Sequence, residues 1–246
     1  MTFLNIEPND ALKLYLTRPH PCSYLPERSA STLFTDPQAR ISGRDYGALL
    51  ARGFRRSGAT FYRPHCAMCR ACIPLRVPVA EFKPRRSQRR VLRLNRDVAV
   101  QRSGSVFNDE HFRLYKRYMT ARHCAAGDAI GSQDYQDFLL HPPEIDCALY
   151  EMRVERRLLA VALVDHVPQG LSAVYTFYDP AETHRSLGVY AVLWQIREAQ
   201  RLGLPWVYLG YWIKQCARMS YKDQYRPCEI YRQGRWRRLE PGADVL

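Results

Sequence analysis

Residues 146–178 read DCALYEMRVERRLLAVALVDHVPQGLSAVYTFY. The stretch holds three runs rich in β-branched and aromatic residues, at 146–154, 158–167 and 171–178, and short turns separate them. Runs of this length and composition, joined by such turns, are typical of consecutive strands connected as hairpins. We therefore predict a β-sheet at the centre of the C-terminal part of the chain.

The segments around these strands extend the pattern. Two helices are predicted before them, one capped by Asn108 and one over 132–140, and a third is predicted from Ser186 to about Leu202. A strand, a short helix and a hairpin are predicted after them, at 206–213, 217–224, 228–232 and 235–239. This order predicts an α/β (α+β) fold, a mixed β-sheet with helices packed on it. It resembles the core of the GCN5-related N-acetyltransferases.

The N-terminal part has a different composition. Residues 1–80 are rich in Pro, Cys and aromatic side chains, with a predicted helix over 45–54, capped by Ser42, and a short strand over 61–63. We predict two domains, which are a smaller Cys-containing basic subdomain at 1–104 and an acyltransferase-like domain of GCN5-related type at 105–246.

Positive charge is concentrated in the first part of the chain. The formal charge is +13, and residues 1–103 hold 19 Lys and Arg against 7 Asp and Glu, whereas residues 104–246 hold 18 against 17. Such an asymmetry indicates a polyanionic partner, and the alternative is a solvated basic surface. The chain has no apolar run of about 20 residues, and Met1–Asp10 lacks the features of a secretory signal. We expect a cytoplasmic protein with no membrane partner.

The segment from Lys83 to Arg96 has seven basic residues among fourteen and no acidic residue. If it is helical, four arginines fall along one face, where guanidinium groups can grip phosphates bidentately. The predicted ligands of a nucleic-acid backbone are Arg85, Arg86, Arg89, Arg90 and Arg93.

Four cysteines are candidate metal ligands. Cys66, Cys69 and Cys72 follow one another at the C-x-x-C spacing of zinc and iron–sulfur sites, and Cys22 is a fourth candidate. The alternative is a set of free thiols in a packed subdomain. We interpret the isolated cysteines as ordinary thiols, namely Cys124, Cys147, Cys216 and Cys228.

Three further groups are candidate binding residues. Arg185-x-x-Gly188 matches part of the turn that opens a pyrophosphate-binding helix in acetyl-CoA enzymes, although Tyr190 is expected to crowd such a ligand. The other candidates for substrate binding are Arg55 and Arg56 for an acidic group, Ser186 at the start of the predicted helix, and the aromatic and basic residues Tyr190, Trp194, Tyr211, Trp212, Lys214 and Lys222. The alternative for the aromatic residues is core packing, and for the lysines it is a snorkelling side chain.

No motif for nucleotide-dependent chemistry is visible. The sequence has no Walker P-loop, no Gly-x-Gly-x-x-Gly, no His-Glu-x-x-His and no serine-hydrolase signature.

Several motifs together resemble one family. The first are Pro21-Cys22-Ser-Tyr-Leu-Pro26, Gly53-Phe-Arg-Arg-Ser-Gly58, the run from Tyr62 to Pro74 with its three cysteines, and Phe82-x-Pro-x-Arg-Ser-Gln-Arg-Arg90. Ser172-x-Val-Tyr-Thr-Phe-Tyr-Asp-Pro180, Ser186-x-Gly-x-Tyr190, Leu193-Trp-Gln-Ile196 and Leu209-Gly-Tyr-Trp-Ile213 follow in order. Over nearly the whole chain they are similar to bacterial aspartate/glutamate leucyltransferases, which are related to eukaryotic arginyl-tRNA–protein transferases. The eukaryotic relatives have a second cysteine in the first motif, where this chain has Leu25. The resemblance therefore makes Cys66 and Cys69 the natural substitutes as metal ligands.

The resemblance implies that leucine passes from leucyl-tRNA to proteins with N-terminal Asp or Glu, which marks them for degradation by the N-end rule. No cofactor is required because the aminoacyl ester is already activated. We predict that the amides near Gly188, or the phenol of Tyr175 or Tyr178, stabilise the oxyanion. Asp179 is the candidate for holding the incoming ammonium, and Arg55 and Arg56 for the acidic side chain. The alternatives are a CoA-dependent acetyltransferase and a non-enzymatic tRNA-binding module.

Overall fold

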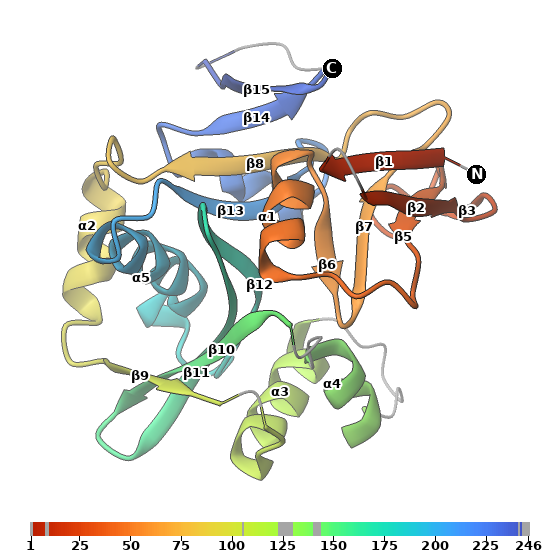
Figure 1. The fold of residues 1–246 in the computed structure, drawn as a ribbon. Coiled ribbons are helices and arrows are strands. Elements are labelled where there is room, and N and C mark those ends of the chain that lie inside the picture. The colour runs from red at the N-terminus through yellow and green to blue at the C-terminus, as the bar shows by residue number, and fades with distance from the viewer. Residues whose placement is uncertain are drawn as a thin grey trace.

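The computed structural model describes residues 2–7, 10–104, 106–122, 130–139, 144–240 and 242 (Figure 1). Cys124 and Leu140, which the sequence analysis named, lie outside the described residues. Within this part of the chain, no helix is long and apolar enough to cross a membrane.

The larger of the sheets is mixed and has eight strands in the described residues. In spatial order they are β15 (Arg235–Arg238), β14 (Glu229–Arg232), β8 (Ile73–Pro78), β13 (Trp206–Trp212), β12 (Gly170–Tyr178), β11 (Arg157–Val167), β10 (Asp146–Val154) and β9 (Ala99–Ser103). β12 and β13 are parallel, and the other neighbouring pairs are antiparallel. The connection between the parallel strands contains a helix, as such a crossover requires.

A second sheet lies beside it and comes from the N-terminal part. Its spatial order is β1 (Thr2–Glu7), β2 (Asp10–Leu16), β5 (Thr32–Thr35), β7 (Thr60–Pro64) and β6 (Arg55–Ser57). Two short strands pair separately, β3 (His20–Pro21) with β4 (Ser29–Ala30).

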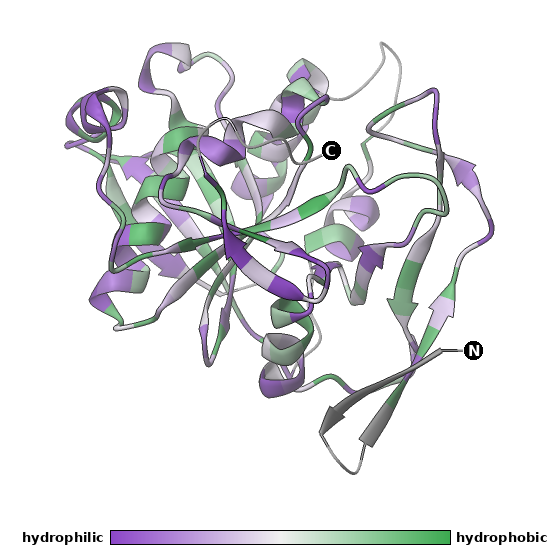
Figure 2. Cartoon of the chain, turned by 90° about the horizontal axis from the view of Figure 1, so that it is seen from above, coloured by the Kyte–Doolittle hydropathy of each residue, from purple (hydrophilic) through white to green (hydrophobic). Residues whose placement is uncertain are grey.

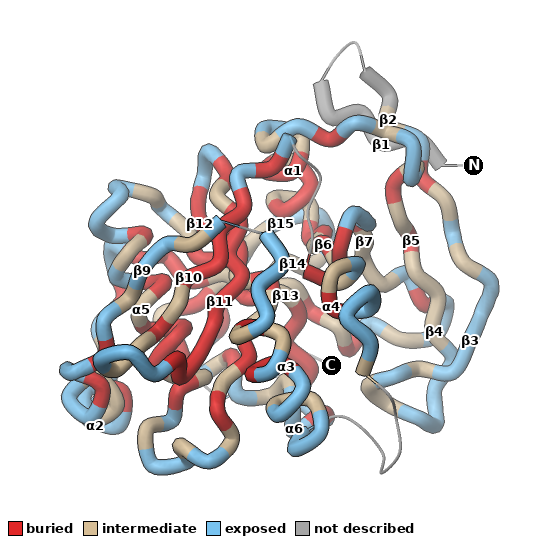
Figure 3. Tube along the Cα trace, turned by 90° about the horizontal axis from the view of Figure 1, so that it is seen from below, coloured by how far each residue is buried: buried red, intermediate tan, exposed pale blue. Residues whose placement is uncertain are grey.

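Helices cover both faces of the larger sheet (Figure 1). On one face α2 (Arg86–Leu94) and α5 (Leu187–Arg201) pack over a core of apolar residues from β8 to β13. On the other face lie α1 (Gly43–Ala51), α3 (Asp109–Arg122), α4 (Ser132–Leu139) and the smaller sheet. The short helices are η1 (Thr183–Arg185), α6 (Ala217–Ser220) and η2 (Tyr221–Gln224). Figure 3 shows that buried residues gather in β11, β12 and β13, whereas α2 and β3 are largely exposed.

The predicted elements of the C-terminal part are confirmed, and their order gives the predicted mixed α/β architecture. Ser42 caps α1 with a capping box to Asp45, and the Asn108 side chain accepts from the first amides of α3. α1 ends at Ala51, earlier than the predicted Phe54, because Gly53 takes a left-handed φ of +80° and turns the chain. Ser186 occupies the N-cap of α5 but does not cap it with its side chain, because its own backbone is left-handed.

Two strands of the larger sheet were not predicted. β8 and β9 both come from residues 1–104, and they pair with strands of residues 105–246. The two parts of the chain therefore share one sheet. The division into domains at residue 104 stays a prediction.

Candidate functional site

An opening lies where β12 and β13 diverge. The two strands pair only from Gly170 opposite Trp206 to Ser172 opposite Tyr208. Beyond that point β13 continues to pair with β8 as far as Trp212, while β12 continues along β11. The ends of β12 and β13 therefore leave a wedge-shaped opening between them in the middle of the sheet. The next long helix after β12 is α5, so its start lies after this end of β12 in the chain.

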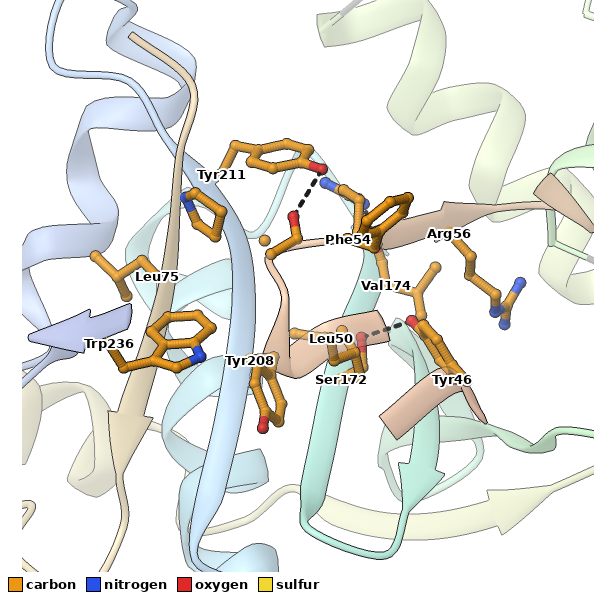
Figure 4. Close-up of a pocket in the computed structure, with 15 residues that line it drawn as sticks. Tyr46, Leu50, Phe54, Arg56, Leu75, Ser172, Val174, Tyr208, Tyr211 and Trp236 are labelled. Carbon is orange, nitrogen blue, oxygen red and sulfur yellow. Dashed lines mark hydrogen bonds between the residues drawn. The ribbon is translucent and has the colours of Figure 1, made fainter. Parts of the chain in front are cut away.

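Arg55, at the start of β6, reaches into this wedge. Its Nη2 donates to the Val174 carbonyl of β12 at 2.9 Å. Gly210 of β13 lies opposite, and a Cβ there would stand 2.9 Å from Nη1 of Arg55. Gly210 also has a φ of +71°, so both its conformation and the nearby guanidinium favour glycine. A narrow cavity of about 10 Å³ lies beside these residues (Figure 4).

Arg56 faces the opposite way and is fully buried. Its Nε donates to Oδ2 of Asp165 at 2.6 Å, and both side chains are 0% exposed. Figure 4 shows Arg56 on the side of the cavity away from Tyr211. Arg56 therefore does not fit the predicted role of binding a substrate's acidic group, because Asp165 already neutralises its charge.

Lys222 lies on the other side of β13 in η2. Its Nζ donates to the Tyr211 carbonyl at 2.7 Å, and the residue is only 6% exposed. Burial, and then the nearby Arg55, lowers the pKa of Lys222 well below its usual range. The snorkelling alternative is wrong for Lys222. Lys214, in contrast, is exposed and stays a candidate.

The two aromatic residues of β13 have structural contacts. The Tyr211 hydroxyl donates to the carbonyls of Gly53 and Tyr62, at 3.2 and 3.0 Å. Trp212 is 4% exposed, and its Nε1 donates to the Ser220 carbonyl at 3.0 Å. Tyr211 therefore anchors the turn before Arg55, and Trp212 fits core packing better than substrate binding.

The two candidate phenols on β12 lie in different surroundings. Tyr178 lies against the first turn of α5, where a Cβ on Gly188 would be 3.2 Å from its ring. Tyr175 packs with α3 and α4, and its hydroxyl donates to the Met119 sulfur at 3.5 Å. The structure thus brings Tyr178 and Gly188 together, and Tyr118 packs between the rings of Tyr175 and Tyr178.

Asp179 is already paired with cations. Arg157 donates to its Oδ2 at 2.9 Å, Arg117 lies at 3.7 Å, and the Ala181 amide donates at 3.1 Å. Burial alone would raise the pKa of Asp179, but these donors outweigh it and hold the pKa below its usual range. This balance does not fit the predicted binding of an ammonium, since two guanidiniums already surround the carboxylate.

The aromatic candidates on α5 belong to the core. Tyr190 is 7% exposed among the apolar residues beneath α5, and Trp194 packs on Tyr150 with ring centroids 4.5 Å apart. The core-packing alternative therefore describes both residues. That Tyr190 would crowd a pyrophosphate at the turn stays a prediction. Ser186 is exposed beside that turn and stays a candidate.

α2 presents its arginines to solvent, as predicted. Hydrophilic residues predominate in it (Figure 2), and an open hollow of about 630 Å³ lies against Arg85, Arg86, Ser87, Arg90 and Arg93. Arg85 bonds Gln224, and Arg89 bonds the Pro84 carbonyl at 2.8 Å. Arg86, Arg90 and Arg93 make no ion pair with any described residue, so their charge faces the hollow uncompensated.

Buried polar side chains tie both ends of α2 to the loops around the opening. At its start Gln88 donates to the Gln224 carbonyl of η2 at 3.2 Å. Near its end Asn95 donates to the Arg185 carbonyl of η1 at 2.8 Å. Gln88 and Asn95 are 3% and 1% exposed. The arginine-rich helix is therefore fixed to the segment with Lys222 and to the turn before Gly188.

The candidate metal cysteines lie near one another. Burial, and then Cys22, Cys66 and Cys69, raises the pKa of Cys72 to about 12. Arg28 donates to the Cys69 sulfur at 3.2 Å. Among the described residues, however, no three His, Cys, Asp or Glu side chains are grouped to hold a metal ion. Zinc or iron–sulfur binding by these cysteines stays a prediction.

Comparisons with known proteins agree on one family. The family model for the N terminus of arginine-tRNA-protein transferases matches residues 20–90, and the model for the C terminus matches residues 110–232. The aspartate/glutamate leucyltransferase of Pseudomonas aeruginosa strain LESB58 is 53% identical over 226 residues, covering 92% of this chain and 96% of the relative. The enzyme of the same name from Pseudomonas fluorescens strain Pf0-1 is 52% identical with the same coverage.

Two solved structures are similar at low identity. The C-terminal domain of a lysylphosphatidylglycerol synthetase from Agrobacterium fabrum, described as putative, has a TM-score of 0.43 at 10% identity, covering 68% of this chain and 50% of that one. The L-PGS structure from Bacillus licheniformis has a TM-score of 0.45 at 15% identity, covering 67% and 61%.

Proposed function

The chain belongs to the arginine-tRNA-protein transferase family, in its aspartate/glutamate leucyltransferase branch, and from this premise we propose that it moves leucine from leucyl-tRNA to the N-terminus of proteins that begin with Asp or Glu. It is an aminoacyltransferase. We also propose that it works in the cytoplasm, that the added leucine marks the acceptor for degradation, and that the larger sheet is of GCN5-related type.

The observation that carries the proposal is the attachment of α2 to both sides of the opening. A tRNA held by phosphate contacts along α2 would present its 3′ end beside η1 and η2, because Asn95 and Gln88 fix the helix to these elements. Phosphate contacts position a nucleic acid without reading its sequence. The amino acid and the acceptor must then be recognised in the opening itself.

The reaction at this site is attack by an amine on an ester. The acceptor α-amine loses a proton and attacks the leucyl carbonyl, the carbon–oxygen bond to the tRNA ribose breaks, and the ribose oxygen takes up a proton. The ester is already activated, so positioning supplies much of the rate enhancement and no cofactor is needed. We assign oxyanion stabilisation to the amides at Gly188 and to the Tyr178 phenol, which lie together at the start of α5.

The test is a single-turnover transfer assay. Radiolabelled leucyl-tRNA is mixed with the enzyme and peptides that begin with Asp, Glu, Ala or Lys, and arginyl-tRNA and acetyl-CoA are run in parallel as alternative donors. We expect label to pass from leucyl-tRNA to the Asp and Glu peptides. Transfer from arginyl-tRNA would reassign the donor, and acetylation without leucylation would overturn the proposal in favour of a CoA-dependent enzyme.

A further inference from the structure

Two basic side chains lie near the opening, and each is bonded to a backbone carbonyl. Arg55 arrives from β6 and bonds the Val174 carbonyl, and Lys222 arrives from η2 and bonds the Tyr211 carbonyl. The Lys222 Nζ also lies 3.7 Å from the Met219 sulfur. Neither cation forms an ion pair with a carboxylate of any described residue.

The residues around the two cations do not supply the missing charge. The neighbouring groups that influence Arg55 electrostatically are the phenols of Tyr24, Tyr62 and Tyr211, and those that influence Lys222 include the thiols of Cys72 and Cys216. These groups are neutral in their ordinary protonation states. A buried cation without a counter-charge costs free energy, which proteins usually offset by pairing it.

The neighbouring Arg56 shows the usual solution in the same strand. Arg56 also belongs to β6, and the Asp165 carboxylate neutralises its charge. The adjacent Arg55 receives no such partner, and this residue is only partly buried beside the opening. The contrast between two consecutive arginines indicates that the anion for Arg55 comes from outside the chain.

The location suits the acceptor rather than the tRNA. Tyr221 directly precedes Lys222, and its phenol is influenced electrostatically by both Tyr178 and Arg55, which places it in the vicinity of the two residues. The uncompensated arginines of α2 lie in a separate hollow. We propose that Arg55 and Lys222 form the subsite that binds the side-chain carboxylate of the acceptor's N-terminal Asp or Glu, and this inference rests on the proposed function. The α-amine on the same residue would then point toward Tyr178 and Gly188.

The electrostatics support the arrangement. Burial and Arg55 both lower the pKa of Lys222, and a carboxylate between the two cations would act in the opposite direction. Binding of an acidic peptide would then favour the ammonium form, whereas an amide side chain of the same shape would not. The subsite therefore discriminates Asp from Asn by charge.

The test compares peptides that begin with Asp and Asn in the wild type, K222M, R55Q and the control K13M. Lys13 is an exposed lysine of β2, so its replacement removes an equal charge. We expect K222M and R55Q to lower the Asp-to-Asn ratio of kcat/KM by about 10- to 100-fold. K13M should leave the ratio unchanged, and melting curves verify that each variant is folded.

An equal loss for Asp and Asn peptides would overturn the inference, because it would indicate a general base or a structural role. Peptide binding to the full chain without tRNA, measured by calorimetry, separates this inference from the proposed function. Preference for the Asp peptide that disappears in K222M would support the subsite even if no leucine is transferred. Equal binding of both peptides by the wild type would overturn it even if transfer occurs.

Discussion

The side-chain amide of Asn95 donates to the backbone carbonyl of Arg185 at 2.8 Å, and this bond joins the end of α2 to the turn that begins α5. Asn95 and Arg185 lie far apart from each other in the sequence. The Arg185 guanidinium also donates to the Asp97 carboxylate at 2.8 Å. The turn before Gly188 is thus held by the same helix that carries the uncompensated arginines. Any tRNA bound along α2 would be placed relative to this turn by that contact.

Replacement of Asn95 by Ala should therefore impair catalysis more than tRNA binding. Loss of the bond leaves the partly buried Arg185 carbonyl without this donor and removes this tie between the turn and α2, at a cost of about 1–3 kcal/mol in stability. We expect kcat to fall about 10-fold while the Kd for leucyl-tRNA changes less than 2-fold, measured by single-turnover transfer and filter binding.

Ser42→Ala is the matched control for Asn95→Ala, because it removes a side-chain contact of similar stability from the exposed cap of α1. Its kcat should stay near the wild-type value. If Asn95→Ala weakens tRNA binding and kcat equally, or if Ser42→Ala has the same effect, the bond does not position the turn.

The arginines of α2 should determine the salt dependence of tRNA binding. Arg86 and Arg90 line the hollow without an ion pair to any described residue, so each is available for one phosphate. Replacing both by Gln should flatten the slope of log affinity against log salt by about 1.4–1.8, given 0.7–0.9 per phosphate contact. Binding titrations between 50 and 300 mM salt give the slope.

Arg156→Gln provides the reference for this titration, since Arg156 is exposed in the turn between β10 and β11. Its slope should equal that of the wild type. An unchanged slope in the Arg86 and Arg90 double variant would remove α2 from the tRNA interface.

The buried pair of Arg56 and Asp165 should be structural. Arg56→Met leaves the Asp165 carboxylate without its guanidinium in a fully buried site, which should lower the free energy of unfolding by about 3–5 kcal/mol. The double variant Arg56→Met with Asp165→Leu should recover much of this loss, because no charge is then buried alone. Urea unfolding of the single and double variants measures the coupling. A double variant no more stable than Arg56→Met would contradict this account.

Local pattern was sufficient to predict most of the C-terminal fold. The alternation and turns of β10 to β12 predicted their bounds to within one residue, because these strands carry β-branched and aromatic residues between clear turns. β8 was missed, although Ile73, Leu75 and Val77 alternate, because Pro74 and Pro78 interrupt the strand signal. Its Arg76 stacks between Trp206 and Trp236, a contact between distant segments that no local pattern contains.

The candidate site was predictable only in its residue types. The sequence placed Arg55 and Arg56 together, but only the direction of each side chain separates a residue at the opening from a core ion pair. The burial of Lys222 also has no local signal, since lysine is almost always exposed. The divergence of β12 and β13 depends on pairing between strands, which composition and periodicity do not describe.

Asp179 should contribute stability that depends on pH. Burial raises its pKa, but the bonds from Arg157 and the Ala181 amide outweigh burial, so the folded pKa lies below the unfolded value of 3.8. A carboxyl group whose pKa is depressed by folding stabilises the fold above its unfolded pKa, and this contribution is lost as the pH falls through the folded value.

Asp179→Asn should therefore reduce the free energy of unfolding at pH 7 by about 1 kcal/mol, a modest value because Arg157 and Arg117 are more than half exposed. The difference from the wild type should begin to shrink as the pH falls below about 3.8 and should vanish only below the lower folded pKa. Asp137→Asn, at an exposed position of α4, should show no such trend in urea unfolding from pH 7 to pH 3. A loss at Asp179 that is the same at every pH would indicate that its hydrogen bonds, and not its charge, hold the turn into α5.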